Sequence, residues 1–358
     1  MIEYNFIFII VCLLIFFNTL VPNKLIEKVS FWFVYLLIVV LAGFRYEISS
    51  DYVIYEQIFN TIAMNDGFNF YFIEPGFIFL NKSLIFLGLN YEEFIFTIAI
   101  LSIGIKFYFI EKLSNKKLIS ALLFFSFYLF LYDLGAIRRG LALGFITLSI
   151  FFYLKERKLE TYIFVLIAAS IHVSALIMIP VFLIAPIKFS LPKLMSVILV
   201  SFILQYIVTN LVHFTFLEQL NNPVAMKALG YFKSGDYFIQ NSFVSIGLMI
   251  RILLAGWIIY YQNRLISHYP YIEKLIYLFV MSLIFLIIFD KLRIFSSVAI
   301  FFKITELLII PYLFFTIKKS YRYIYFSFII TYSYLSFYKL VNNPYETDYL
   351  PYISIFNK

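Results

Sequence analysis

The stretch LISALLFFSFYLFLYDLGAIRRGLALGFITLSIFFYL, residues 118–154, decides the class of fold. Its two apolar runs, 118–131 and 141–154, flank the polar segment Asp133-Leu134-Gly135-Ala136-Ile137-Arg138-Arg139-Gly140. Each run is long enough to cross most of a bilayer as a helix, so the polar segment lies where two spanning helices meet at a membrane face. A carboxylate and two adjacent arginines at such a place either lie among the lipid headgroups or bind an anionic ligand.

Composition extends this conclusion to the whole chain. Of 358 residues, 63% are hydrophobic and 13% are charged, which excludes an ordinary soluble protein. We predict an all-α, polytopic integral membrane protein of about 10–13 spanning or re-entrant helices, with residues 1–358 forming a single transmembrane domain. The net charge of +8 requires no nucleic-acid partner, because Lys and Arg collect in the short loops between spans. The only cysteine, Cys12, excludes disulfides within the chain.

Basic loops orient the chain by the positive-inside tendency. The lysines within 24–28, 111–117 and 155–158 predict cytoplasmic loops, which places the polar segment at 133–139 outside. Further outer loops are expected near 45–73, 218–240, 290–293 and 339–358. Because arginines on the outer face run against the positive-inside tendency, topology alone does not account for the two arginines of the polar segment.

Two apolar segments are predicted to be irregular. The stretch from Pro75 to Leu89 is too short to span comfortably as a helix, so we expect it to be re-entrant or strongly tilted. The run 162–186 has His172 at its middle, and a single span there would put the later basic loops outside. Two half-helices that meet near His172 keep Lys188 and Lys193 inside.

The outer surface predicted by this topology gathers many ionisable residues, and their convergence is the main functional signal. They are Arg45, Glu47, Asp51, Glu74, Asp133, Arg138, Arg139, His172, Asp290 and Arg293. For any one carboxylate or arginine, a solvated side chain at headgroup level or an ion pair between helices is an equally good explanation. Asp290 and Arg293, three residues apart, could pair with each other at a helix end.

The types of residue in this set point to phosphate and proton chemistry. An imidazole in a long apolar run is rare unless it faces a bundle interior or a water-filled cavity, although a structural histidine bonded to a carbonyl is an alternative. The titration of His172 near neutral pH suits proton transfer. Arg138 and Arg139 offer planar forks for phosphate oxygens. We therefore predict a site for a phosphate-bearing lipid with acid–base groups beside it.

Other motifs are less informative. Tyrosines cluster around the first outer loop, where an interfacial aromatic belt is favoured over a platform for sugar rings. They are Tyr46, Tyr52, Tyr55, Tyr71 and Tyr91. The sequence has no zinc-ligand spacing, no Gly-rich phosphate loop and no Gly-x-Ser-x-Gly elbow, so metal hydrolases, nucleotide-driven pumps and serine hydrolases lack their usual motifs, and we expect no cofactor.

A series of short motifs carries a resemblance to a known family. Gly43-Phe44-Arg45 is followed by Asp51-Tyr52 and Tyr55, Glu74-Pro75-Gly76-Phe77, Ile137-Arg138 with Ala142, and Ser170-Ile171-His172 with Ser174-Ala175. In this order the motifs resemble those of the EpsG-like family, which belongs with the Wzy-type polymerases of bacterial O-antigen, capsule and exopolysaccharide. The likeness covers most of the chain and is strongest from Gly43 to Pro180. The chain departs from the family pattern at Arg139, where glutamine is frequent, and at Ser50, where a Gly-Thr pair is common before the aspartate.

The resemblance implies an inner-membrane glycosyltransferase of the broad GT-C type that works without a metal. Such an enzyme would transfer a growing glycan from its polyprenyl diphosphate carrier to the sugar end of a second lipid-linked repeat unit at the periplasmic face. The expected partners are the polyprenyl-diphosphate-linked oligosaccharide, the lipid bilayer and a chain-length regulator protein.

Within that mechanism, Arg138 is predicted to bind the donor diphosphate, aided by Arg139 and Arg45, and to stabilise the charge that develops as the glycosidic bond breaks. His172 or Asp133 is predicted to accept the proton of the attacking hydroxyl, with His172 favoured. The other residues predicted to contact substrate are Asp51, Tyr52, Tyr55, Glu74, Asp290, Arg293 and Tyr345.

Two other classes of protein share some of these features. A flippase of lipid-linked oligosaccharides would also gather basic residues around an anionic carrier, but it predicts charges throughout the bilayer depth and an internal repeat. A membrane-bound acyltransferase would also place a histidine in an apolar segment, but it requires an acyl donor.

Overall fold

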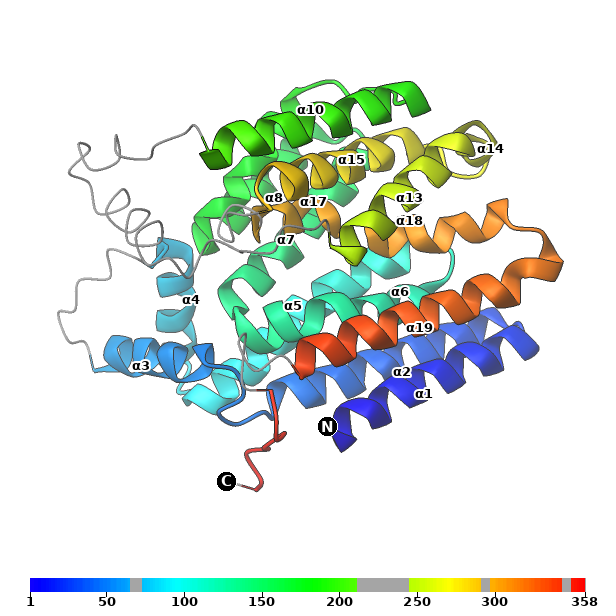
Figure 1. The fold of residues 1–358 in the computed structure, drawn as a ribbon. Coiled ribbons are helices and arrows are strands. Elements are labelled where there is room, and N and C mark those ends of the chain that lie inside the picture. Colours follow the sequence, from blue (N-terminus) through cyan, green and yellow to red (C-terminus); the bar gives the residue numbers. More distant parts are fainter. Residues whose placement is uncertain (65–72, 211–244, 291–296, 343–348, 358) are drawn as a thin grey trace. The chain divides into compact units, whose positions relative to one another are not determined.

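The computed structural model describes residues 1–64, 73–210, 245–290, 297–342 and 349–357, which are predominantly helical (Figure 1). Among these described residues, six helices are long and apolar enough to span a membrane. The chain is therefore an all-α, polytopic membrane protein, as predicted. It divides into two compact units, one of Met1–Ala175 with Ile310–Lys358 and the other of Leu176–Ile309. That the whole chain folds as one domain stays a prediction.

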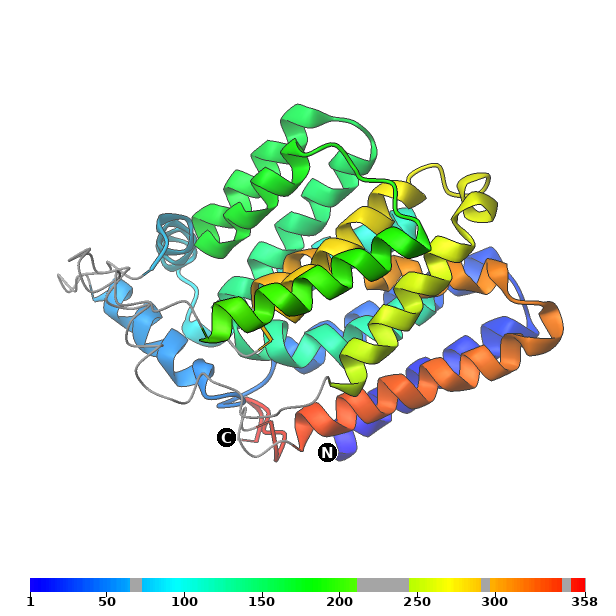
Figure 2. The same ribbon diagram turned by 45° about the horizontal axis from the view of Figure 1, so that its top comes forward.

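The first unit contains most of the long helices. They are α1 (Ile2–Leu20), α2 (Lys24–Gly43), α3 (Asp51–Ala63), α4 (Pro75–Phe86), α5 (Tyr91–Leu113), α6 (Lys117–Phe124), the π-helix η1 (Phe125–Gly135), α7 (Ile137–Leu154), α8 (Lys158–Ile171) and α19 (Arg322–Val341). Short 3₁₀ turns lie at Leu313–Thr316 and Lys319–Tyr321. α7 packs against both α5 and α8, and α5 packs against α2. α1, α2 and α19 run side by side in this unit (Figures 1 and 2).

Local signals in the sequence fix where several of these helices begin. The Asn23 side chain accepts hydrogen bonds from the backbone amides of Leu25 and Ile26 and so caps α2. Asn90 and Glu93 form a capping box at the start of α5. Pro75 occupies the first turn of α4, where its missing N–H costs nothing.

The predicted span at 118–131 changes its helical form on the way to the polar segment. α6 continues directly into η1, and together they are almost wholly buried. A Cβ atom on Gly140 would lie 2.8 Å from the carbonyl carbon of Tyr132, so only glycine allows the end of η1 and the start of α7 to pack this closely. This close turn sets the direction in which the first residues of α7 leave the bundle.

The C-terminal segment 349–357 packs back onto the beginning of the chain. The backbone amide of Tyr46 donates to the carbonyl of Ile353 at 2.9 Å, and that of Ile355 donates to Phe44 at 2.9 Å. The Tyr349 hydroxyl donates to the carbonyl of Phe130 at 2.8 Å, while the Tyr349 carbonyl accepts from the Tyr4 hydroxyl. These bonds tie the tail to α1, to η1 and to the loop after α2.

The second unit is built around α15 (Ile272–Ile288). Its other elements are α9 (Met178–Leu183), α10 (Leu191–Asn210), α13 (Ile246–Tyr260), α14 (Gln262–Ile266), η3 (Ser297–Ala299), α17 (Ile300–Lys303) and the first part of α18 (Glu306–Tyr312). The 3₁₀ turn η2 (Val173–Ile177) leads from the first unit into this one. α10 and α13 pack against α15 and against each other (Figure 2). The Tyr277 hydroxyl on α15 donates to the carbonyl of Val181 at 3.1 Å.

The run 162–186 breaks near His172, as predicted, whereas the re-entrant or tilted course expected of the stretch from Pro75 to Leu89 stays a prediction. α4 is a helix of 12 residues. α8 ends at Ile171 and is followed by His172, whose backbone is extended, and then by the 3₁₀ turn η2. The segment predicted as the outer loop near 45–73 contains a helix, α3, in its described part. The polar segment 133–139 spans the end of η1 and the start of α7. The predicted loop at 218–240 lies outside the described residues.

Tyr349→Ala tests the anchoring of the C-terminal segment. We expect a loss of about 3–5 kcal/mol of unfolding free energy, because the change removes a buried aromatic ring together with its hydrogen bond. The thermal unfolding midpoint in detergent measures the loss. Tyr338→Ala, on the half-exposed face of α19, should lower the midpoint much less, and equal losses would show that the tail is not an anchor.

Candidate functional site

Glu74 occupies the N-cap position of α4, where the chain turns from an extended backbone into the helix. α4 packs against α8, and the contact requires Gly76, because a Cβ atom there would lie 2.6 Å from the Ser170 carbonyl oxygen. Since Ser170 is two residues before His172, this contact brings the start of α4 to the end of α8. The Glu74 carboxylate thereby reaches the backbone amide of Val173, which donates to Oε1 at 3.2 Å.

Arg138, in the first turn of α7, forms an ion pair with Glu74. Its Nη1 donates to Oε2 at 2.7 Å. The guanidinium carbon also lies 5.8 Å from the ring centroids of Tyr55 and Phe77, within the range of cation–π attraction. The Arg138 side chain is 19% exposed and that of Glu74 15%, so the pair is largely enclosed but reachable from outside.

His172 and Arg139 extend this pair into a connected cluster. His172 Nδ1 lies 3.4 Å from Glu74 Oε1, and the Nε–H of Arg139 donates to His172 Nε2 at 3.3 Å. Arg138, Glu74, His172 and Arg139 therefore follow one another in contact, and we call these four residues the Glu74 cluster. They come from three segments that are far apart in the sequence.

Asp51, the first residue of α3, borders the Glu74 cluster. Burial raises the pKa of its carboxyl group, while the nearby charges of Arg139 and Arg138 act in the opposite direction. For Glu74, burial also raises the pKa, but the contact with His172 and the charge of Arg138 prevail and lower it to about 2. Glu74 is thus ionised at any physiological pH and provides a permanent negative charge between the imidazole and the guanidinium.

Asp133 is not part of this cluster. Its carboxylate accepts from the Lys106 ammonium at 2.6 and 2.8 Å and from the Ser102 hydroxyl. Both charged side chains are enclosed, with exposures of 0% and 1%. Lys106 and Ser102 lie on α5, so the triad joins α5 to the end of η1. Lys106 is not among the residues predicted from the sequence, although a lone lysine inside an apolar run signals a partner of opposite charge.

Arg45 and Tyr52 also lie apart from the Glu74 cluster. Arg45 is buried, its Nη1 donates to the Ala42 carbonyl, and its guanidinium lies 5.9 Å from the Tyr52 ring centroid. Tyr91 donates from its hydroxyl to the Tyr52 carbonyl at 2.8 Å. Tyr52 and Tyr55, three residues apart on α3, therefore contact different arginines, and only Tyr55 contacts the Glu74 cluster.

The remaining predicted residues are in other parts of the chain. Asp290 follows α15 in the second unit. Arg293 and Tyr345 lie outside the described residues.

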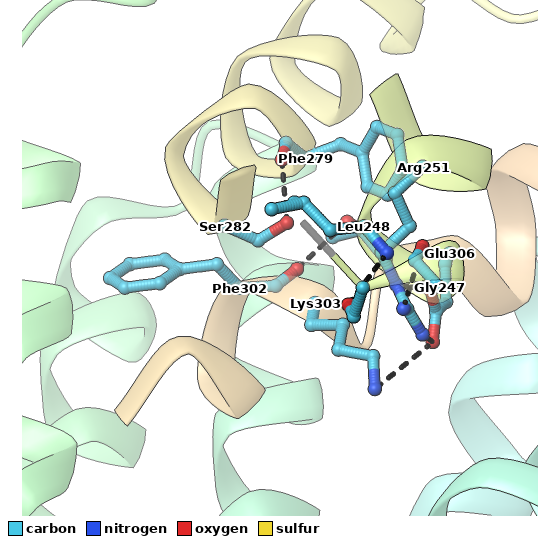
Figure 3. A network of polar contacts seen from close by, with 10 residues as sticks. Gly247, Leu248, Arg251, Phe279, Ser282, Phe302, Lys303 and Glu306 are labelled. Carbon is cyan, nitrogen blue, oxygen red and sulfur yellow. Dashed lines mark hydrogen bonds and ion pairs between the residues drawn. The ribbon is translucent and has the colours of Figure 1, made fainter. Parts of the chain in front are cut away.

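The second unit contains a charged network that was not predicted from the sequence (Figure 3). Arg251 on α13 donates from Nε to Glu306 Oε2 at 2.9 Å and from Nη1 to the Gly247 carbonyl at 3.1 Å. Lys303 Nζ lies 3.7 Å from Glu306 Oε1. Each of these charges stands within an apolar stretch, and that isolation is the signal that could have indicated the pairing. The network links α13 to the short helices α17 and α18.

The chemistry available to the Glu74 cluster is anion binding and proton transfer. Two guanidinium groups provide donors for phosphate oxygens, and a neutral imidazole can accept a proton. Among the described residues there is no group of three or more His, Cys, Asp or Glu side chains that could hold a metal ion.

The fold and this cluster define a polytopic, all-α membrane protein with a partly exposed polar site. The family model that matches the chain is that of the EpsG family, over residues 28–354, and the chain belongs to this family. It is accordingly a multi-pass membrane protein of the polysaccharide-polymerase type. Comparison with curated proteins and with solved structures gave no match.

Lys106→Met tests the buried ion pair. We expect a loss of about 3–5 kcal/mol of unfolding free energy, because Asp133 would keep a buried charge without its partner. The double variant Lys106→Met/Asp133→Leu should recover most of that loss, and thermal unfolding in detergent measures both. Lys112→Met, at the exposed end of α5, is the matched control. If Lys106→Met and Lys112→Met lower the unfolding midpoint equally, the buried ion pair does not stabilise the fold.

The pKa of Glu74 makes a prediction about pH. The folded-state pKa of about 2 is below the usual 4.5, so ionised Glu74 stabilises the fold above the unfolded-state pKa and loses this effect as the pH falls toward 2. The difference in unfolding midpoint between wild type and Glu74→Gln should not fall between about pH 8 and about pH 5 and should shrink below that. In protein that already carries Arg138→Gln, Glu74→Gln should change the unfolding midpoint less, because the ion pair is already absent. A difference that already falls between neutrality and about pH 5 would contradict the ion pair.

Proposed function

We propose that this protein polymerises a surface polysaccharide, either O-antigen, capsule or exopolysaccharide. It would transfer a glycan from a polyprenyl diphosphate carrier onto a second lipid-linked repeat unit, as a glycosyltransferase that requires no metal. The observation that carries the proposal is the Glu74 cluster, in which a phosphate-binding type of residue and a proton-accepting type of residue from separate segments lie within one set of contacts.

Arg138 is the residue we assign to the donor diphosphate. Its Nη1 is engaged by Glu74, but its buried Nε–H has no hydrogen-bond acceptor among the described residues. A buried donor without a partner costs free energy, which an anionic oxygen bound beside it would recover. The same contact strengthens as negative charge develops on the diphosphate, so it would stabilise the transition state more than the ground state.

His172 is the residue we assign as the general base. The hydroxyl oxygen of the acceptor sugar attacks the anomeric carbon of the donor glycan, and its proton passes to His172 Nε2. The bond from that carbon to the diphosphate oxygen breaks, and the electron pair leaves with the polyprenyl diphosphate near Arg138. The products are the acceptor-linked, lengthened glycan and the free carrier diphosphate.

The other predicted residues are assigned different roles. Asp133 and Arg45 are assigned structural roles. Asp133 is enclosed and bound by Lys106 and Ser102. Arg45 also has an Nε–H without an acceptor among the described residues, but at 2% exposure it is enclosed, whereas Arg138 is reachable from outside. We assign Glu74 to hold Arg138 and His172 in place, and Asp51 and Tyr55 to border the space for sugar and phosphate. We propose that the acceptor unit contacts Asp290, Arg293 and Tyr345, and that a chain-length regulator protein associates with the enzyme.

The proposed location is the inner membrane of a bacterium, with the site open to the periplasm. α7 supports this orientation, since it begins beside Arg138 and ends at Leu154, followed by the basic segment 155–158. By the positive-inside tendency that segment is cytoplasmic, which puts the opposite end of α7 at the periplasmic face.

Arg138→Ala and His172→Ala test the mechanism in cells that lack their own copy of the gene. Each should lower polymerisation about 100-fold or more, because each removes a group needed in the transition state. Gel electrophoresis of the surface polysaccharide should then show the single-repeat product in place of a ladder. Arg157→Ala, in the exposed loop after α7, should leave the ladder unchanged.

The same gel separates the alternatives. A full ladder from either variant at normal protein level removes that residue from the mechanism. Loss of all surface repeat units would favour a flippase, and a full-length polymer lacking only acyl groups would favour an acyltransferase.

A further inference from the structure

The hydrogen bond between Arg139 and His172 fixes the protonation pattern of the imidazole. The Nε–H of arginine can only donate, and it points at His172 Nε2 over 3.3 Å. Nε2 must therefore be the unprotonated nitrogen, and the ring proton is on Nδ1. Nδ1 faces Glu74 Oε1 at 3.4 Å, so the permanent carboxylate charge favours the same tautomer.

This tautomer is the one that a general base requires, with the proton on the nitrogen that faces a carboxylate and a lone pair on the other. In the structure, however, the Nε2 lone pair is already used by Arg139. The charged groups that face the imidazole are Glu74 from the start of α4, together with Arg138 and Arg139 from α7. A proton could reach Nε2 only after the Arg139 guanidinium has moved away.

We infer that Arg139 covers the lone pair of His172 and that a bound diphosphate uncovers it by drawing the Arg139 guanidinium onto phosphate oxygens. This inference rests on the proposed function and adds to it a positioning role for Arg139. This movement of Arg139 would couple donor binding to the general base, because His172 becomes available only when the anionic donor is present.

The contacts indicate which arginine moves. Arg138 is held by an ion pair of 2.7 Å and by two aromatic rings at 5.8 Å. The hydrogen bond that Arg139 makes to His172 is to a neutral acceptor at 3.3 Å. A bond from guanidinium to phosphate joins two opposite charges, whereas the bond to His172 has a charge on the donor alone, so a diphosphate competes well for Arg139.

The chain suits a direct measurement, because it contains only three histidines. Changing His213 and His268 to Gln leaves His172 as the one source of signal in protein labelled with ¹⁵N-histidine. The protein is studied by NMR in dodecyl maltoside, a detergent without phosphate. Geranyl diphosphate is the lipid probe, inorganic pyrophosphate tests the diphosphate group alone, and geraniol is the uncharged control.

We expect the Nε2 resonance of His172 to be that of an unprotonated nitrogen that accepts a hydrogen bond. Geranyl diphosphate should move it toward the position of a free lone pair, and geraniol should not. Arg139→Gln should show the moved position without any ligand and little further change with geranyl diphosphate. Arg139→Lys provides a second variant that keeps the charge, should the first fail to fold.

The outcomes separate this inference from the proposed function. If calorimetry detects no binding of geranyl diphosphate, the proposed function fails and the inference with it. If geranyl diphosphate binds but leaves the His172 resonance in place, only the inference fails. A resonance that shows Nε2 protonated in the free protein would also overturn it. If pyrophosphate shifts the His172 resonance as much as geranyl diphosphate does, the inference is supported and the diphosphate group alone is sufficient. If only geranyl diphosphate shifts it, the inference is supported and the ligand is the lipid-linked form.

Discussion

A charge in the apolar interior of this protein needs an opposite charge or polar groups around it, and the described ion pairs show how far that requirement shapes the chain. Lys106 and Asp133 are completely enclosed and satisfy each other across α5 and η1. Arg251 and Lys303 converge on Glu306 in the second unit. Because desolvation of a lone charge costs several kcal/mol, each pair fixes which helices lie together more strictly than apolar contacts could.

In the Glu74 cluster not every polar group has a partner, and this distinguishes the cluster from the structural ion pairs. Glu74 contacts Arg138 and His172, yet the Nε–H of Arg138 has no acceptor in the described part of the chain, and the cluster is partly exposed. Polar groups left with spare capacity at a reachable place are the ones that can receive a ligand. The enclosed pairs support the fold, whereas this cluster is suited to binding and chemistry.

Breaks in regular helix position that cluster. The chain enters α4 through Glu74 and Pro75, leaves α8 at His172 with extended backbone, and turns from η1 into α7 just before Arg138. Glycine permits two of the close contacts involved, at Gly76 against Ser170 and at Gly140 against Tyr132. Each side chain of the cluster therefore lies at a helix end, where it can leave the bundle without interrupting a hydrogen-bonded turn.

The sequence alone determined the membrane class, the helical fold, the short helix after Glu74 and the break at His172, because hydropathy, proline position and the distribution of basic residues can be read directly along the chain. It also selected Arg138, Arg139, His172 and Glu74 as candidate site residues, and the structure brings these four together. Only the tertiary structure decided which polar residues meet. Asp133 contacts Lys106, and Arg45 lies in the interior near Tyr52. A charge isolated in an apolar run signals that it has a partner, but which partner it meets depends on how distant helices pack.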